Sequence, residues 1–183
     1  MKLPRLVAAL GVVAYGLTNC AAATPVPAAD VKAAFIYNFA RFAQWPAETL
    51  ESDRAVPACI LGDTAVADAL ERTARGHAIQ GRALQVRVVR VGDQLLSCRL
   101  LYISGVDAKA AARLIAPLAN LSTLTISDSD DFAESGGIAE LFVEDGRMRF
   151  AINVSAARRA RVALSANMLS LAKIVKEDRD GTR

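Results

Sequence analysis

Short apolar runs alternate with helix-like segments between residues 57 and 127, and this order restricts the fold more than any other feature. The helix-like segments, 63–75 and 107–118, each begin at an aspartate that can serve as an N-cap. The order strand, helix, strand, strand, helix, strand favours a mostly parallel sheet covered by helices. The four apolar runs are residues 57–62, 82–91, 99–103 and 121–127.

A sheet of this kind also indicates where a ligand site would lie. Ligands of open parallel sheets bind beyond the carboxyl ends of the strands. Gly62 and Asp63 stand at the end of the first apolar run, and Ser127 and Asp128 stand at the end of the last one. Both pairs are therefore expected near the same edge of the sheet.

The C-terminal third has a different pattern. Apolar residues at 137–143 and 147–154 flank the dipeptide Asp145-Gly146, which tolerates the positive φ values of a tight hairpin turn. Ser155 is expected to cap a long final helix that ends at about Lys176. The predicted fold class is α/β: a single domain with a mixed, mostly parallel sheet flanked by helices, a C-terminal β-hairpin and a long C-terminal helix.

The N-terminus has the three parts of a secretory signal peptide. Lys2 and Arg5 precede an apolar segment at 6–17, and alanines at 21–23 supply a cleavage site. A retained membrane anchor is one alternative. A lipoprotein modified at Cys20 is another, but Asn19 is a poor match to the small residue that such sites prefer.

One domain is therefore expected after an export signal. Loss of Lys2 and Arg5 with the signal lowers the formal net charge from +3 to +1, and no long basic run is interleaved with aromatic residues. Nucleic acid is therefore not an expected partner. The predicted divisions are a signal peptide at 1–23, a leader at 24–29, a domain at 30–176 and a flexible tail at 177–183.

Residues 30–46 hold five of the ten aromatic residues of the chain. Their apolar positions repeat at helical spacing from Asp30, the expected N-cap, to about Gln44, and Pro46 stops the helix. A buried core helix is the simplest interpretation of this stripe. Under the alternative, the helix also presents aromatic side chains to a partner, and the candidate contacts are then Tyr37, Phe39 and Trp45.

Cys59 and Cys98 form an even pair once Cys20 leaves with the signal. Thiols in an exported chain tend to oxidise, so a structural disulfide is expected. The chain-entropy estimate for closing a loop of this length is about 4 kcal/mol. Metal binding or redox chemistry is the alternative, although the spacing is not that of a C-x-x-C motif.

No motif for catalysis, phosphate binding or a cofactor is present, and His77 is the only histidine. We therefore predict a protein that is not an enzyme and carries no cofactor. The acidic stretch 128–131 is interpreted as a capping or solvated loop, with Ca²⁺ binding as the alternative. Residues 135–137 are interpreted as a turn that leads into the hairpin, with an anion-binding site as the alternative.

Three arginines, Arg158, Arg159 and Arg161, are expected in the first turns of the final helix, where the helix dipole disfavours cations. A solvated face is the plain interpretation of such a run. The alternative is a surface that binds an acidic partner.

The first helix, AAFIYNFARFAQWP at 33–46, resembles the opening helix of the YfiR family of exported bacterial proteins. The final segment 164–172, LSANMLSLA, is the second specific match. Shorter similarities link the two, so that the resemblance covers nearly all of residues 30–175. They lie at 59–62, 81–84, 98–103, 125–128, 132–138 and 150–153.

The resemblance implies a periplasmic regulator that binds the periplasmic sensor part of an inner-membrane diguanylate cyclase and represses it, limiting cyclic di-GMP signalling and biofilm formation. It also implies homodimers. Cys59 and Cys98 match a cysteine pair of the family, whereas Ala133 and Glu140 lie where its best-known member has a second pair. The alternative function is a periplasmic module that binds a small ligand for another sensor or a transporter.

Overall fold

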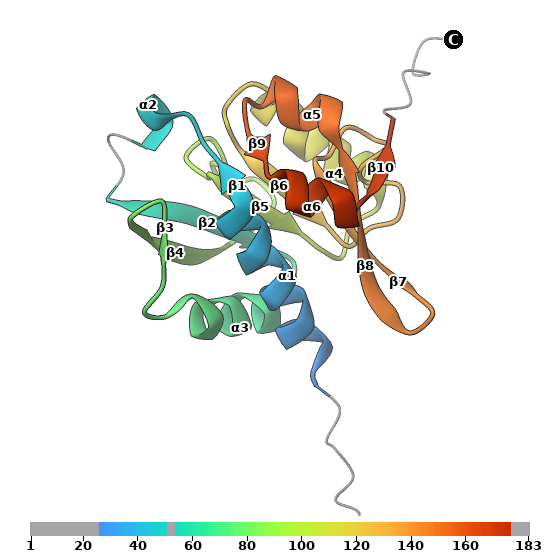
Figure 1. Cartoon of the computed structure of the whole chain (residues 1–183), viewed down its shortest axis with the longest axis horizontal. Helices are drawn as coiled ribbons and strands as arrows, with labels where there is room; N and C mark the ends of the chain where they lie inside the picture. Colours follow the sequence, from blue (N-terminus) through green and yellow to red (C-terminus); the bar gives the residue numbers. More distant parts are fainter. Residues whose placement is uncertain (1–25, 51–53, 177–183) are drawn as a thin grey trace, which may run out of the picture.

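The computed structural model describes residues 26–50 and 54–176 and is built around one large sheet (Figure 1). Among these residues the sheet has eight strands, in the spatial order β10-β8-β7-β6-β5-β2-β4-β3. Two further short strands, β1 (Ala43–Gln44) and β9 (Ala163–Leu164), pair with each other. The strands of the large sheet are β2 (Ala55–Leu61), β3 (Ala78–Ile79), β4 (Arg82–Val89), β5 (Leu100–Ile103), β6 (Leu124–Ser127), β7 (Ala139–Glu144), β8 (Arg147–Asn153) and β10 (Lys173–Val175).

Most neighbouring strands run parallel. β4, β2, β5, β6 and β7 form one parallel block, and β10 is parallel to β8. The β3–β4 and β7–β8 pairs are antiparallel. The β7–β8 hairpin turns at Asp145 and Gly146, whose φ values of 50° and 69° are both in the left-handed region that this turn requires. The prediction of a mixed, mostly parallel α/β sheet with a C-terminal hairpin is confirmed.

Helices cover both faces of the sheet (Figure 1). Successive residues of a strand point to opposite faces, so one strand supplies two cores. In β2, Ile60 packs in the core beneath α1 and α3, whereas Cys59 and Leu61 pack in the core beneath α4. The helices concerned are α1 (Ala28–Phe42), α3 (Thr64–Ala74), α4 (Ala108–Ile115) and the 3-10 turn η1 (Ala116–Leu118).

The predicted aspartate caps are present. Asp63 accepts the Val66 N–H at 3.1 Å at the start of α3, and Asp107 accepts the Ala110 N–H at 2.7 Å at the start of α4. The helix predicted from Asp30 begins two residues earlier, at Ala28, and ends at Phe42. A short helix, α2 (Ala47–Leu50), follows Pro46.

The predicted extent of the C-terminal helix is wrong, because the segment forms two short helices and two strands. Asn153, rather than Ser155, caps α5 (Val154–Arg159) by accepting the Ala156 N–H at 2.9 Å. Arg161 then adopts a φ of 54°, and β9 pairs with β1. Ser165 caps a second helix, α6 (Ala166–Leu171), after which β10 pairs with β8. Pairing with distant strands outweighs the helical periodicity that the sequence displays.

The predicted signal peptide at 1–23, the first two residues of the leader and the tail at 177–183 lie outside the described residues. The last two residues of the predicted leader, Ala28 and Ala29, open α1. Within the described part of the chain, no helix combines the length and apolar character that crossing a bilayer demands.

Candidate partner-binding surface

An apolar groove of about 310 Å³ lies between α1, β8 and α6. Its lining contains four phenylalanine rings, one methionine and one leucine, and its polar side chains are two asparagines. Concave, mainly apolar sites with a few polar groups are typical of binding sites. The lining residues are Ala34, Phe35, Asn38, Phe39 and Phe42 of α1, Phe150 of β8, and Asn167, Met168 and Leu171 of α6.

The groove has a packed floor and an exposed rim. Phe39 is 2% exposed, and its ring meets that of Phe150 edge-on, with centroids 5.1 Å apart. Phe35 contacts the same Phe150 ring at 6.1 Å. At the rim, Phe42 is 41% exposed and Leu171 is 76% exposed. Since the floor rings are held in place by one another, the rim residues are those free to contact another molecule.

The three aromatic residues predicted from the sequence lie in different surroundings. Phe39 is part of the groove floor. Tyr37 is half-buried on the other side of α1, with its ring 6.0 Å from that of the exposed His77. Trp45 is 4% exposed, and its indole N–H donates to the Arg99 carbonyl at 3.2 Å. Of these, only Phe39 belongs to the groove.

Sequence reasoning did not single out Phe35, Phe42 or Leu171 as contacts. Phe35 and Phe42 were visible on the apolar stripe of the first helix, where they could not be told from core residues. The sequence predicts one continuous final helix that includes Leu171, whereas in the structure Leu171 ends the short helix α6 and forms the opposite wall of the groove.

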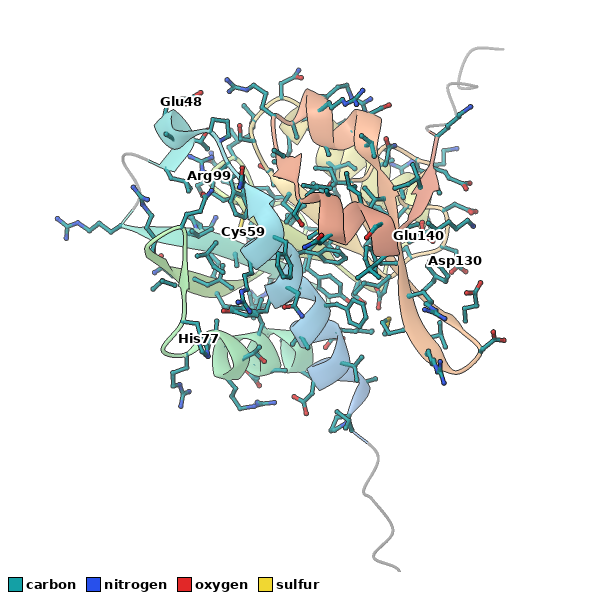
Figure 2. The ribbon with its side chains drawn as sticks, viewed as in Figure 1. Glu48, Cys59, His77, Arg99, Asp130 and Glu140 are labelled. Carbon is teal, nitrogen blue, oxygen red and sulfur yellow. A yellow bond between two sulfur atoms is a disulfide. The ribbon has the colours of Figure 1, made fainter. Side chains whose placement is uncertain are left out.

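The three predicted arginines are exposed and lie outside the groove. Arg158 and Arg159 project from α5, and Arg161 lies 3.6 Å from Glu48 of α2, which Figure 2 labels. Arg159 lines a second hollow of about 260 Å³ between α5 and the α4–η1 segment. The α5 and α6 helices pack against the same core as α1.

Polar side chains converge at the carboxyl ends of β2, β5 and β6, as the sequence predicts for Asp63 and Asp128. The Lys32 ammonium of α1 reaches this edge and lies 2.5 Å from Asp128 and 3.9 Å from Asp63. Ser104, directly after β5, donates to the same Asp128 oxygen at 3.2 Å. The Cβ of any other residue at position 62 would lie 2.0 Å from the Ser104 carbonyl oxygen, so Gly62 lets the two strand ends approach.

The charges at this edge are compensated. Burial alone would raise the pKa of Asp128, but the hydrogen bond and charge of Lys32, helped by Ser104, hold that pKa below its usual value. Burial, with the nearby Asp128 carboxylate, raises the pKa of Tyr102. The Tyr102 hydroxyl lies close to Ser104 and Asp128, yet its geometry satisfies no hydrogen bond. Lys32 thus pairs, from within the chain, with the two aspartates at this edge of the sheet.

Cys59 and Cys98 are joined by a disulfide, as predicted, and both are fully buried. The bond ties β2 to the segment that precedes β5, with 5.8 Å between the two Cα atoms. Arg87 of β4 donates to both sulfur atoms, from Nε to Cys59 at 3.1 Å and from Nη2 to Cys98 at 3.4 Å. Among the described residues, no three His, Cys, Asp or Glu side chains are grouped so as to hold a metal ion.

A model of the YfiR/HmsC-like family matches residues 29–173, from the first turn of α1 to the first residue of β10. The chain belongs to the YfiR/HmsC-like family. Members of this family are periplasmic, non-catalytic regulators of diguanylate cyclases, and the family implies contact with the periplasmic domain of such an enzyme. The family membership expected from the resemblance of residues 30–175 is therefore confirmed.

A solved structure has a similar fold. It is that of a conserved domain protein from Vibrio cholerae O1 biovar El Tor, with a TM-score of 0.51 and 14% sequence identity. The alignment covers 81% of this chain and 60% of the Vibrio protein, so the chain spans less than two thirds of that protein. At this identity the likeness concerns the fold alone. No curated protein matches the chain.

Proposed function

We propose that this chain binds the periplasmic portion of an inner-membrane diguanylate cyclase and holds the enzyme inactive, which limits cyclic di-GMP signalling and biofilm formation. Membership of the YfiR/HmsC-like family supports the proposal. The observation on this molecule that carries it is the apolar groove between α1, β8 and α6, whose rim residues Phe42 and Leu171 are exposed. Exposed apolar side chains around a concave surface are typical of protein interaction sites.

Co-expression with a membrane diguanylate cyclase encoded beside its gene tests this function. The wild-type chain is expected to co-purify with the cyclase and to lower cyclic di-GMP in the cell. A cyclase that neither associates with the chain nor changes its output would refute the proposal.

Charged substitutions on the groove rim locate the contact. Phe42→Glu and Leu171→Glu are each expected to weaken association about tenfold or more, because a carboxylate would be desolvated at an apolar interface. Val143→Glu, at a 67% exposed apolar residue of the β7–β8 hairpin, is the matched control and is expected to bind like the wild type. Equal losses in all three variants would show that the groove is not the contact surface.

A small-ligand module is the second candidate function, and the size and apolar lining of the groove favour it. Indole is a suitable probe, since its flat aromatic ring matches the four phenylalanine side chains. A thermal shift with indole that Phe42→Glu abolishes, together with no cyclase association, would favour this function over the first.

Export and dimerisation complete the proposal. The mature chain is expected to begin after Ala23, which the intact mass of protein recovered from the periplasm would establish. A homodimer is expected by analogy with the family, and light scattering of the purified protein measures it. A monomer at all concentrations would remove dimerisation from the proposed function.

A further inference from the structure

The hollow of about 260 Å³ between α5 and the α4–η1 segment exists because small side chains face each other across it. Its larger apolar residues come from both cores of the sheet: Ile115 and Leu118 from the core beneath α4, and Ile138 from the core beneath α1. It shares no lining residue with the groove between α1, β8 and α6. The small lining residues are Ala112, Ala116, Ala119, Gly136, Ala156 and Ala160.

Polar side chains line the hollow from three parts of the fold. Arg159 projects from α5, and it is the only charged residue among the described residues of the lining. Ser135 belongs to the 128–138 loop between β6 and β7, and Thr125 belongs to β6. An arginine guanidinium matches the planar fork of a carboxylate, and hydroxyl groups can add further hydrogen bonds to it. The side chains of this lining are therefore suited to an anion.

The Thr125 hydroxyl is buried and keeps a proton that it can donate. Thr125 is 4% exposed, and its hydroxyl oxygen accepts the Ile138 N–H at 3.0 Å. Across the described ranges, Thr125 donates to no other protein group. Thr123, the other threonine of the lining, does donate, to the Cys98 carbonyl at 2.8 Å. A buried donor of this kind favours a bound molecule that supplies an acceptor.

The 128–138 loop offers the hollow its Ser135 side chain rather than its backbone N–H groups. The N–H groups of residues 135–137 each donate to a carbonyl of residues 131–133. An anion site at 135–137, which the sequence raises as an alternative, therefore cannot be built from these N–H groups alone. In the structure it depends on side chains, and Arg159 lies on the same hollow as Ser135.

One buried side chain fixes both walls that carry Ser135 and Arg159. Asn153 is fully buried, and its amide N–H donates to the Ala133 carbonyl of the 128–138 loop at 2.8 Å. Its amide oxygen accepts the Ala156 N–H at 2.9 Å and so caps α5. Because the two walls are held in place before any ligand arrives, binding costs little further ordering of the backbone.

We propose that this hollow binds a small carboxylate with a compact apolar body. The Arg159 guanidinium binds the carboxylate, with the Ser135 and Thr125 hydroxyls as further donors, and the isoleucine and leucine side chains contact the apolar body. A cavity of about 150 Å³ lined by apolar side chains takes up benzene, so this hollow has room for a benzene ring that carries a carboxylate. The site goes beyond the proposed function, because it requires neither the cyclase nor the groove.

Benzoate is the probe, and its titration into the isotope-labelled full chain tests the site by NMR. The amide signals of Gly136 and Ala160 are expected to shift and to saturate with a Kd of about 1 mM, which is ordinary for a ligand of this size. Benzamide has the ring without the charge, and acetate has the charge without the ring. Each is expected to bind at least about fivefold more weakly than benzoate. Equal binding of benzamide would refute recognition of the carboxylate, and equal binding of acetate would refute the apolar contact.

Three variants locate the benzoate. Arg159→Gln is expected to weaken binding about fivefold to tenfold, because it removes the charge-assisted hydrogen bond. Arg158→Gln is the matched control, since Arg158 is the neighbouring exposed arginine and does not line the hollow. Its binding is expected to equal that of the wild type. Ala116→Leu adds bulk from an exposed lining position, without altering the charge, and is also expected to weaken binding.

The outcomes that overturn the site are distinct from a failure of the proposed function. Wild-type amide signals that do not move with benzoate would leave the hollow as a hydrated space only. Equal losses in the two arginine variants would show a general effect of positive charge, and unchanged binding by Ala116→Leu would place the benzoate elsewhere. Since no cyclase is present in these titrations, its failure to associate with the chain would not change their result.

Discussion

Asp128, directly after β6, and Glu140, on the neighbouring strand β7, are two partly buried carboxylates whose pKa values move in opposite directions. Burial is the largest influence on both and raises each of them. Asp128 accepts a hydrogen bond from the Lys32 ammonium, which reverses the effect of burial. Glu140 has neutral backbone donors and lies near Asp130 and Asp131, so its pKa remains raised. Burial acts in the same direction on both carboxylates, so the cation beside Asp128 is what makes the signs of the two shifts differ.

The contrast separates two kinds of attachment. Lys32 fastens α1 to the carboxyl edge of the sheet with a compensated ion pair whose side chains are only 20% and 18% exposed. Glu140 fastens the 128–138 loop through the Ala133 N–H, which donates to its carboxylate. The first attachment is firm at neutral pH and weakens in acid, whereas the second is strained at neutral pH and relaxes in acid.

Removal of the Lys32 ammonium is expected to have the largest effect. Lys32→Met keeps most of the apolar stem but leaves Asp128 partly buried without its cation, which is expected to cost about 3 kcal/mol of unfolding free energy. Urea unfolding at neutral pH measures the loss.

The double variant Lys32→Met/Asp128→Asn is the control for this pair. It removes both charges, so much of the lost stability is expected to return. If Lys32→Met lowered the unfolding free energy by no more than about 0.5 kcal/mol, the pair would be no stronger than an ordinary surface salt bridge. The contrast with Glu140 would then be weakened.

Asn153→Ala is expected to have the second largest effect. The substitution leaves the Ala133 carbonyl and the Ala156 N–H without their side-chain partner in a fully buried place, a loss of about 2 kcal/mol. Asn153→Asp keeps the cap but cannot donate to Ala133, so comparison of the two variants in urea separates the cap from the loop anchor. Equal stabilities of Asn153→Asp and the wild type would show that the loop anchor contributes nothing.

Features that depend on local geometry were predictable from the sequence. Asp63 and Asp107 cap their helices because a cap bonds an N–H only three residues away, and Asp145-Gly146 turns its hairpin for an equally local reason. The proximity of Asp63 and Asp128 could be predicted from the topology, because parallel strands have their carboxyl ends at the same edge of the sheet.

Features that depend on distant partners were not predictable. The final helix is interrupted because residues 163–164 pair with 43–44 and residues 173–175 pair with 151–153. The helical periodicity of a sequence does not indicate such strand pairings. For the same reason, nothing in the sequence marked Lys32 as the partner of two aspartates, or joined Phe150 and Met168 to α1 as walls of one groove.

The smallest expected effect tests the sign of the Glu140 shift directly. A carboxyl whose pKa is raised in the folded state contributes stability that is complete below its ordinary value, 4.5, and is lost as the pH rises through the raised pKa. Glu140→Gln removes this loss while it retains an acceptor for the Ala133 N–H. The variant is therefore expected to be more stable than the wild type above that window, by less than about 1 kcal/mol, and to lose this advantage near pH 4. Urea unfolding across this pH range measures the difference. The difference for Lys32→Met, taken likewise as the unfolding free energy of the variant minus that of the wild type, should change in the opposite sense. It is expected to become more negative as the pH rises and less negative as acid protonates Asp128, because a lowered pKa contributes stability that disappears as the pH falls. If both differences varied with pH in the same direction, the nearest charges would not be what distinguishes the two carboxylates.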